Sequence, residues 1–248
     1  MAYPNFDNKH LEESLFGPQD RPSFKKVPKN LPKKYILIYD RNLKARIKRK
    51  LSPKKISKLS RTLMDFYCYK DVGIIFMKGV GSPHAVMALE QLIAYGGKIF
   101  LNIGSAGGLK EEGFFLCKKA LRDEGTSYHY ISQGEYSYPN NFLTNKFGKF
   151  MKKERIHYND CISWTIDAPY METKAEIEKY SKKGITTVEM EASALFAVAS
   201  IKKVKIASAF VVSDILGEKW ESKFSTHSFK RGIDTLFYAA LKFLEGPN

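Results

Sequence analysis

The 248-residue sequence predicts an α/β fold in which helices cover both faces of a central sheet. Short apolar runs that suit buried strands alternate with longer segments whose apolar residues recur at helical spacing. Glycines follow several of these runs, and a repeated strand, glycine turn and helix is typical of such sheets. The length suits one large domain or two small ones and slightly favours one.

The first half of the chain contains three expected strands and two expected helices. We expect strands at 34–40 (KYILIYD), 72–81 (VGIIFMKGVG) and 98–108 (KIFLNIGSAGG), the last two running into glycine turns. The helices are expected at 42–51 (NLKARIKRKL) and 82–97 (SPHAVMALEQLIAYGG). Ser82 is expected to cap the second helix, with Pro83 in its first turn and glycines after its end.

The second half continues the alternation. Strands are expected at 161–166 (CISWTI), 184–190 (GITTVEM) and 205–214 (KIASAFVVSD). The segment 192–201 (ASALFAVASI) is apolar around nearly its whole circumference, which predicts an interior helix, and 228–246 predicts a closing amphipathic helix. A segment rich in proline and lysine precedes Tyr35. We therefore expect an N-terminal extension at 1–34, packing on the domain or on a neighbouring subunit, and one domain at 35–248.

The net charge of +15 belongs to one part of the chain. Residues 24–61 include 15 Lys and Arg against a single acid, Asp40, which leaves 26 basic and 25 acidic residues elsewhere. This segment could be a solvated helix face, a surface that attracts phosphate, or a nucleic-acid patch. Nucleic acid is the weakest of the three interpretations because no aromatic residues interleave with the charges in a ladder.

Several features indicate a cytoplasmic protein that does not cross a membrane. The longest apolar runs, such as YILIY and IASAFVV, are far too short to span a bilayer. The N-terminus is polar and lacks the apolar core of a signal peptide. Three cysteines, Cys68, Cys117 and Cys161, lie far apart, which predicts reduced thiols and neither a disulfide framework nor a zinc site.

Polar residues follow three of the expected strands, where ligands bind in open α/β sheets. The segments are IGSAGG at 103–108, VEME at 188–191 and VVSD at 211–214. Glycines and a serine after a strand can direct backbone N–H groups at an anion, although such turns are common, and Asp214 could simply cap a helix. Burying a carboxylate in apolar surroundings costs roughly several kcal/mol of free energy unless the charge is paired. Glu189 and Glu191 therefore need either an internal partner or a ligand.

The ordered set of motifs resembles the nucleoside phosphorylase superfamily, which includes purine nucleoside phosphorylases, uridine phosphorylases and methylthioadenosine nucleosidases. The similar stretches are GVGSPHAVMALEQLIAYG, NIGSAGGL, RDEGTSYHY, TIDAPY, VEMEASALFAVA and VVSD, within about 79–220. RDEGTSYHY with DAPY looks nearest to a uridine phosphorylase-like subgroup. The resemblance implies a single-domain, three-layer α/β fold whose mixed central sheet is partly barrel-like. It also implies a homo-oligomer, either a dimer or a trimer of dimers.

The resemblance implies roles for the acids at the two later strand ends. Glu191 would hold the ribose hydroxyls, Met190 would pack against the sugar, and Glu189 would be a structural acid tied to backbone or to a basic side chain. A fixed carboxylate beside the sugar stabilises the positive charge that builds up as the N-glycosidic bond breaks. Asp214, after Ser213, would act as general acid for the leaving base.

The base-binding residues are less well defined by the resemblance. The Gln-x-Arg triplet with which uridine phosphorylases read uracil aligns with Thr173 and Ala175, so its polar pair is absent. Tyr170, beside Pro169, could stack on the base or lie in the core. Gly107 is expected to line the base site. The identity of the base, purine or uracil, is left open.

The expected phosphate site departs from the family pattern. Asn102 stands where phosphorylases have an arginine, as in the hydrolytic nucleosidases, and Asp40 is the only acid where nucleosidases keep their water-activating glutamate. Other residues favour phosphate. The resemblance places Gly104, Ser105 and Arg122 in the phosphate pocket. Arg41, Lys44 and Arg46 lie just beyond the first strand, where phosphate would bind. We therefore expect a phosphorylase that cleaves a nucleoside to free base and (deoxy)ribose 1-phosphate, with inorganic phosphate as co-substrate and no other cofactor. The alternatives are a nucleosidase, or a non-catalytic nucleoside- or nucleotide-binding protein whose basic segment contacts nucleic acid.

Two histidines remain. In several members of the superfamily an N-terminal histidine reaches into the neighbouring subunit's site, and His10 could do this or could lie on the surface. His129, inside a matching stretch, is a candidate pocket residue. Neither has metal-ligand spacing to another His, Cys or acid, so no metal is expected.

Overall fold

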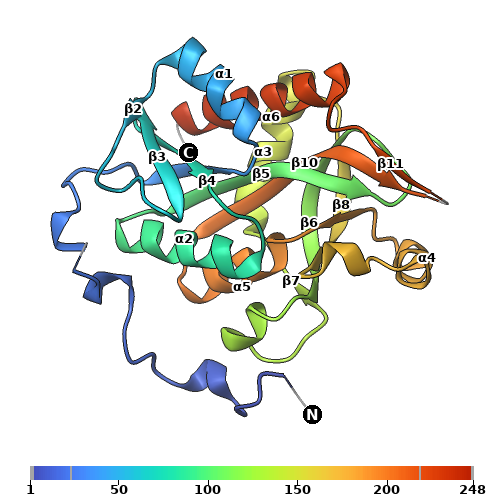
Figure 1. The fold of residues 1–248 in the computed structure, drawn as a ribbon, viewed down its shortest axis with the longest axis horizontal. Coiled ribbons are helices and arrows are strands. Elements are labelled where there is room, and N and C mark those ends of the chain that lie inside the picture. Colours follow the sequence, from blue (N-terminus) through green and yellow to red (C-terminus); the bar gives the residue numbers. More distant parts are fainter. Residues whose placement is uncertain (1–2, 23, 218, 247–248) are drawn as a thin grey trace.

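The computed structural model describes residues 3–22, 24–217 and 219–246. Within these residues one mixed sheet runs through the molecule, in the order β11-β10-β6-β8-β9-β5-β1-β4-β3-β2, and β7 pairs with β6 (Figure 1). The strands are β1 Lys34–Ile38, β2 Lys54–Lys55, β3 Met64–Tyr69, β4 Val72–Met77, β5 Ile99–Gly108, β6 Phe114–Asp123, β7 Tyr136–Ser137, β8 Asn159–Ile166, β9 Thr187–Glu189, β10 Lys205–Leu216 and β11 Trp220–Ser222. The helices are α1 Arg41–Leu51, α2 Ser82–Ala94, α3 Asn141–Lys153, α4 Lys174–Lys182, α5 Ala192–Ile201 and α6 His227–Glu245.

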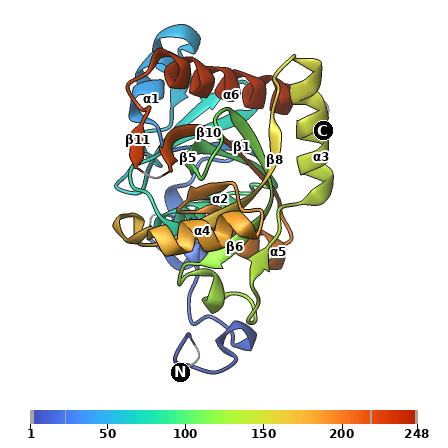
Figure 2. The ribbon, with the colours of Figure 1, turned by 90° about the vertical axis from the view of Figure 1, so that its right-hand side faces the viewer.

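Helices cover both faces of this sheet, which makes three layers (Figure 2). Helices α2 and α5 bury their apolar side chains against one face, and α1, α3 and α6 bury theirs against the other. The predicted α/β fold with a mixed, partly barrel-like sheet is confirmed. The three cysteines are free thiols, as predicted.

The barrel-like part of the sheet is a ring of five strands. Strand β10 pairs with both β5 and β6, β6 pairs with β8, β8 with β9, and β9 with β5, so the ring closes on itself. Closing a sheet removes its unpaired edges. Because β5 also pairs with β1, the ring continues into the open sheet.

The glycine-rich segment after Ile103 corrects one prediction. We expected a glycine turn there, but β5 continues through Gly108, pairing with β10 along its length and with β9 at Gly107 and Gly108. The glycines allow neighbouring elements to approach closely. A Cβ on Gly107 would lie 2.5 Å from Leu216 Cδ1 and 2.9 Å from Val188 Cγ1. Glycine is therefore needed here for the packing inside the barrel.

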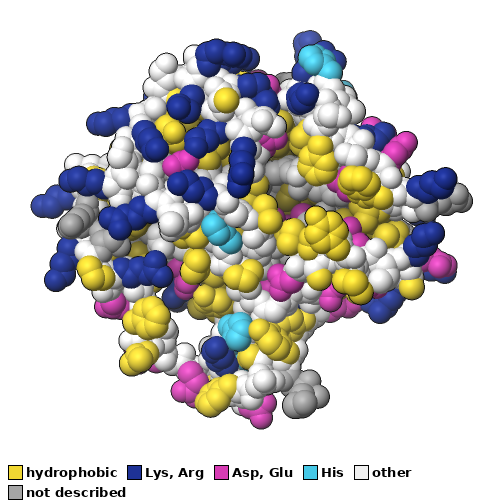
Figure 3. Space-filling model, viewed as in Figure 1, with side chains coloured by type: hydrophobic (Ala, Val, Ile, Leu, Met, Phe, Trp, Pro, Cys, Tyr) yellow, Lys and Arg dark blue, Asp and Glu magenta, His cyan; other side chains and the backbone are white. Residues whose placement is uncertain are grey.

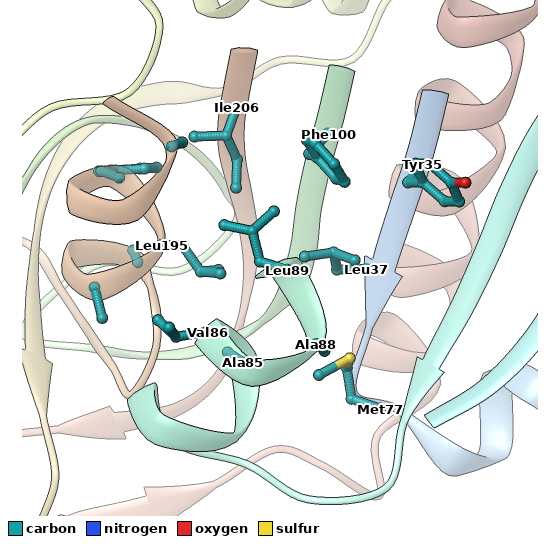
Figure 4. Close-up of a cluster of buried hydrophobic side chains, with 14 of the residues drawn as sticks. Tyr35, Leu37, Met77, Ala85, Val86, Ala88, Leu89, Phe100, Leu195 and Ile206 are labelled. Atoms are coloured by element: carbon teal, nitrogen blue, oxygen red, sulfur yellow. The ribbon is translucent and has the colours of Figure 1, made fainter. Parts of the chain in front are cut away.

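Helix α5 lies in the interior, as its uniformly apolar sequence predicts. All residues from Ala192 to Ala199 are buried, and α5 packs beside α2. Leu195 and Leu89 of the two helices lie with Phe100 and Ile206 of the sheet in one apolar cluster (Figure 4). Helix α5 is thereby fixed, and with it the VEME segment that leads into it.

The start of α2 differs from the prediction. Gly81, with φ of +94°, is the N-cap, and Ser82 is the first helical residue. The Ser82 hydroxyl instead donates a hydrogen bond of 2.8 Å to the Met190 carbonyl oxygen. Glycine favours this backbone conformation because it has no Cβ to clash. The turn before α2 is therefore tied directly to the VEME segment.

The described residues 3–22 and 24–33 contain three short 3-10 turns, at Lys9–Leu11, Pro18–Asp20 and Phe24–Lys26, and they lead along the protein to β1 (Figure 1). The Tyr3 hydroxyl lies 2.8 Å from His129 Nε2, and the Gln133 side chain donates to the Tyr3 carbonyl oxygen. None of the helices in the described part of the chain is sufficiently long and apolar to cross a membrane.

Replacing Leu195 by alanine tests the importance of the interior helix. Leu195 is fully buried, so Leu195→Ala should lower the free energy of unfolding by about 2–5 kcal/mol, through lost transfer energy and a residual cavity. Urea unfolding followed by circular dichroism measures this. Ile201→Ala, on the same helix at a side chain 43% exposed, is the control and should cost less than about 1 kcal/mol. Equal losses for the two variants would contradict the described packing.

Candidate active site

A cavity of about 660 Å³ opens where the barrel strands end. The face of the molecule in Figure 3 is hollowed to the right of its centre, and hydrophobic side chains border the hollow. The cavity brings together seven residues that the sequence predicts for the site: Gly104, Ser105, Gly107, Tyr170, Met190, Glu191 and Asp214. They come from β5, β10, the VEME segment after β9, and the segment before α4.

Glu189 is buried and serves as the structural acid of the VEME segment. Its Oε1 accepts hydrogen bonds from the hydroxyls of Ser163 (3.2 Å) and Thr165 (2.6 Å) on β8. Its Oε2 accepts from the backbone N–H groups of Glu191 (2.8 Å) and Ala192 (2.7 Å). Burial raises the pKa of Glu189, whereas these four donors favour its charged form. The carboxylate is therefore satisfied by hydroxyls and backbone, with no basic side chain among these donors.

Glu191 lies on the cavity wall, and its carboxyl group accepts fewer hydrogen bonds than that of Glu189. Its Oε1 accepts one hydrogen bond, of 2.6 Å, from the Gly81 backbone N–H. Burial and then the nearby charge of Glu189 raise the pKa of Glu191 to about 8. A carboxyl group that is buried, weakly paired and on a cavity wall is a strong candidate for ligand binding.

Asp214 lies within β10 and is held by two donors. The Ser213 hydroxyl donates to Oδ1 (2.6 Å), and the indole N–H of Trp220 donates to Oδ2 (2.9 Å). A Cβ on Gly107 would come within 3.4 Å of the same Oδ2, so this strand is close beneath the carboxylate. Asp214 is thus fixed in position and does not cap a helix.

The segment before α4 forms another wall of the cavity. Tyr170 is fully exposed, which excludes the alternative that it is a core residue. Thr173, which aligns with the missing uracil-reading triplet, caps α4 through a hydrogen bond from the Glu176 backbone N–H. Glu172 and Lys174, which sequence reasoning missed, both line the cavity.

The arginines expected at a phosphate site lie outside the cavity lining in the described residues. The Arg122 guanidinium is buried against Tyr128, 4.1 Å from the ring centroid, and donates to the Ser127 hydroxyl and the Ser132 carbonyl oxygen. Arg41 is exposed, and its guanidinium donates weakly, at 3.5 Å, to the Lys78 carbonyl oxygen. Both side chains are directed elsewhere by contacts that the sequence pattern does not reveal.

The neighbouring basic residues of α1 are held by acids. Lys44 forms an ion pair with the buried Asp65, and Arg46 forms one with Asp234 at 2.8 Å. Asp40 caps α1 by accepting a hydrogen bond from the Leu43 backbone N–H. Figure 3 shows that lysines and arginines are most frequent in the upper left part of this face, with others at its right edge.

The two candidate histidines also lie outside the cavity lining. His10 belongs to the first 3-10 turn of the N-terminal segment. His129 contacts Tyr3, and burial lowers the pKa of its imidazole. Across the described residues, no group of three or more His, Cys, Asp or Glu side chains is arranged to hold a metal ion.

Two cavity residues that the sequence analysis did not assign to ligand binding carry unpaired buried polar atoms. The Tyr39 hydroxyl and Asn102 Oδ1 are buried without a hydrogen-bond partner, and both residues line the cavity. Burial, followed by the charges of Glu191 and Glu189, raises the pKa of Tyr39 well above its usual range. Tyr39 is therefore a neutral donor that faces acids, and a ligand would satisfy such unpaired atoms.

These features define an α/β protein with a site for a small polar ligand at the open end of a barrel-like sheet. A sequence model of the Phosphorylase superfamily matches residues 20–245, which is most of the chain. The chain therefore belongs to this superfamily, as the motifs predict.

Individual relatives are similar at low identity. A purine nucleoside phosphorylase of Plasmodium falciparum is 26% identical over 172 residues, covering 66% of this chain and 69% of that protein. An uncharacterized protein of Acanthamoeba polyphaga mimivirus is 28% identical over 158 residues, covering 60% and 61%. A guanosine phosphorylase of Halorubrum lacusprofundi is 29% identical over 140 residues, covering 54% and 57%. The aligned part thus spans between about half and seven tenths of these relatives.

Solved structures with the same fold include enzymes of two kinds by name. The purine nucleoside phosphorylase of Toxoplasma gondii in complex with immucillin-H has a TM-score of 0.76 at 16% identity, covering 86% of this chain and 90% of that one. An AMP nucleosidase of Bacteroides thetaiotaomicron has a TM-score of 0.71 at 18% identity, covering 87% and 90%. At this identity the likeness concerns the fold alone.

Glu191→Gln tests the raised pKa of Glu191. The folded state holds this proton up to a pH of about 8, whereas the unfolded chain releases it near the ordinary value of 4.5. Between these values the unfolded state binds fewer protons, so Glu191 makes the protein less stable as the pH rises, by at most about 1.4 kcal/mol per pH unit. Glutamine lacks this titration and can still accept from Gly81.

The stability of Glu191→Gln relative to the unsubstituted protein should therefore increase between pH 5.5 and pH 8. Urea unfolding of both proteins at the two pH values measures the difference. Glu178→Gln, at an exposed position on α4, is the control and should show no such increase. A constant difference between Glu191→Gln and the unsubstituted protein would contradict the raised pKa.

Proposed function

We propose that this protein cleaves the N-glycosidic bond of a nucleoside in the described cavity, and that water is the nucleophile. The observation that carries the proposal is the position of Glu191, a buried carboxyl on the cavity wall that accepts a hydrogen bond from the Gly81 backbone N–H and has no basic side chain among its described hydrogen-bond donors. Two ribose hydroxyls can donate to such a group. The relatives named as nucleoside phosphorylases, and the similar fold named as a nucleosidase, support cleavage of this bond.

The chemistry follows from the charge beside the sugar. As the bond from C1′ to the base nitrogen lengthens, positive charge builds up on the ribose. Binding the hydroxyls at Glu191 aligns the sugar, and the ionised carboxylate stabilises the charged transition state more than the neutral substrate. Met190 lies beside it in the lining and offers an apolar contact for the sugar.

The charge of the cavity favours water over phosphate. Among the described lining residues there are four acids, Glu172, Glu189, Glu191 and Asp214, and the one Lys or Arg is Lys174. A phosphate dianion would enter a site with an excess of negative groups, and binding it without arginines is electrostatically unfavourable.

Tyr39 also supports water as the nucleophile. Its ring lies against β5, where a Cβ on Gly104 would be 3.5 Å from Tyr39 Cδ2. The Tyr39 ring therefore reduces the space that is left for phosphate beside Gly104 and Ser105. The unpaired Tyr39 hydroxyl and Asn102 Oδ1 offer one donor and one acceptor, which suits a water molecule.

Phosphorolysis, which the sequence analysis favours, is the second candidate. Ser105 lines the cavity and can bind an anion, and several relatives are named phosphorylases. In this case phosphate would be a co-substrate, and cations would have to come from outside the described lining, for example from a neighbouring copy of the chain.

Product analysis distinguishes the two candidates. The protein is incubated with inosine, adenosine, guanosine, uridine and methylthioadenosine, with and without phosphate, and the sugar product is identified. We expect free sugar, formed at the same rate without phosphate. Ribose 1-phosphate that appears only when phosphate is present would show phosphorolysis instead, and no cleavage of any nucleoside would reject both.

Tyr39→Phe tests whether the unpaired hydroxyl contributes to catalysis. Losing one preorganised donor in a buried site should lower kcat by about 10- to 100-fold. The fold should be retained because the hydroxyl makes no hydrogen bond within the described protein. Steady-state kinetics measures the effect, and Tyr138→Phe, at a side chain 62% exposed, is the matched control. An unchanged kcat in Tyr39→Phe would remove Tyr39 from the site.

A further inference from the structure

Glu172 is a cavity residue to which neither the motifs nor the proposed reaction at the ribose assigns a role. It lies between the 3-10 turn Pro169–Met171 and α4, and it lines the cavity together with Asp214. Its carboxyl group makes no hydrogen bond or ion pair with any of the described residues, although the residue is largely shielded from solvent. An acid in this position is available to a ligand.

The neighbouring Asp214 is held by the protein on both of its oxygens. The Ser213 hydroxyl donates to Oδ1 (2.6 Å), and the Trp220 indole N–H donates to Oδ2 (2.9 Å). Because an indole N–H can only donate, this contact keeps Oδ2 as an acceptor and fixes the direction of the carboxyl group.

Glu172 has the opposite environment. Burial, then the charge of Asp214 and then that of Glu176 raise the pKa of Glu172 to about 7. Two carboxyl groups whose surroundings differ in this way divide the work between a proton carrier and a fixed anion. The nearby charge of Glu189 acts on Glu191, whereas the nearby charge of Asp214 acts on Glu172.

We propose that Glu172 is the general acid of this site and that Asp214 is a positioning anion beside it, an assignment that rests on the proposed function. The bond from C1′ to the base breaks, and its electron pair leaves with the base nitrogen. The Glu172 carboxyl transfers its proton to the base, and water forms the new bond to C1′. The proton that this water releases restores Glu172. The products are the neutral base and the free sugar.

The assignment also explains the partly open wall. Glu172 stands on a short segment with the exposed Tyr170, so that a base held against the tyrosine ring would have a carboxyl group at its edge. Lys174, two residues further on, lines the same cavity.

Glu172→Gln with two classes of substrate tests the proposal. A nucleoside needs a proton on its leaving base, whereas p-nitrophenyl riboside has a leaving group that departs without one. Glu172→Gln should lower kcat for nucleosides by about 100-fold or more and change p-nitrophenyl riboside cleavage only a few-fold. Glu191→Gln should impair both substrates because both form the same sugar cation. Glu178→Gln is the control for a surface change on α4.

The pH dependence separates catalysis from a structural role. With nucleoside bound, the ribose hydroxyls donate to Glu191 and lower its pKa, so kcat of the unsubstituted protein should fall as the pH rises through about 7, where Glu172 loses its proton. Glu172→Gln should lack this descending limb, and Asp214→Asn should move it to lower pH by removing the neighbouring charge. Normal nucleoside cleavage in Glu172→Gln, or an equal loss with both substrates, would overturn the proposal.

One measurement does not depend on turnover. The ¹³C signal of the Glu172 carboxyl, assigned by its absence in Glu172→Gln, should titrate with a midpoint near 7. A midpoint below about 5, the ordinary range of a glutamate, would overturn the assignment. If the midpoint is near 7 but the unsubstituted protein cleaves neither substrate, the proposed function fails, and the role of Glu172 as an acid in that reaction fails with it.

Discussion

The buried carboxylate of Glu189 holds the site together. It receives two hydroxyl hydrogen bonds from β8 and two backbone hydrogen bonds from the start of α5, so one side chain joins a barrel strand to the interior helix. Losing one of these four donors would reduce the compensation of a buried charge, which is costly. The same network fixes the backbone of Glu191, whose own side chain accepts a hydrogen bond from the Gly81 backbone N–H. One acid is thus satisfied internally so that the next can remain available to a ligand.

The closed part of the sheet determines where Glu189 and Glu191 lie relative to the cavity. Glycines in β5 let Leu216 and Val188 approach closely, and the ring of β5, β10, β6, β8 and β9 leaves a cavity at its open end. The two strands that carry Asp214 and the VEME segment both pair with the glycine-rich half of β5. The packing that closes the barrel therefore also determines which polar side chains face the cavity.

Much of the fold and part of the site follow from sequence patterns. Helix α5 is recognisable because only an interior helix is apolar on every side, and the buried acids before it indicate a ligand or an internal partner. Strands β3 and β6 and helix α3 were not predicted, although the buried Leu143, Phe147 and Met151 of α3 recur at helical spacing. The glycine run in β5 was wrongly predicted as a turn, since its partner strands are distant in sequence.

The site residues also divide into those whose place the sequence predicts and those whose place it does not. Arg122 matches a motif, but its side chain is held by Tyr128 and by the loop after it, which no spacing in the sequence reveals. Tyr39 and Glu172 look like an ordinary strand-end tyrosine and an ordinary surface glutamate. The candidacy of Tyr39 comes from its buried hydroxyl without a hydrogen-bond partner, and that of Glu172 from its place in the cavity lining beside Asp214. Unsatisfied groups are a property of packing in three dimensions, so they cannot be read from residue order.

The excess of negative charge in the cavity bears on the type of reaction. Four acids around one lysine would repel an anionic substrate group, yet the repulsion lessens if the bound molecule becomes positive. The ribosyl group is positive only in the transition state, whereas the substrate and the products are neutral. Burial first, and then the charges of neighbouring acids, raise the pKa values of Glu191 and Glu172, so protons neutralise both groups until a ligand arrives. Several acids close together are stabilised by a positive charge between them. Such a site can therefore stabilise a ribosyl cation that forms only while the glycosidic bond breaks.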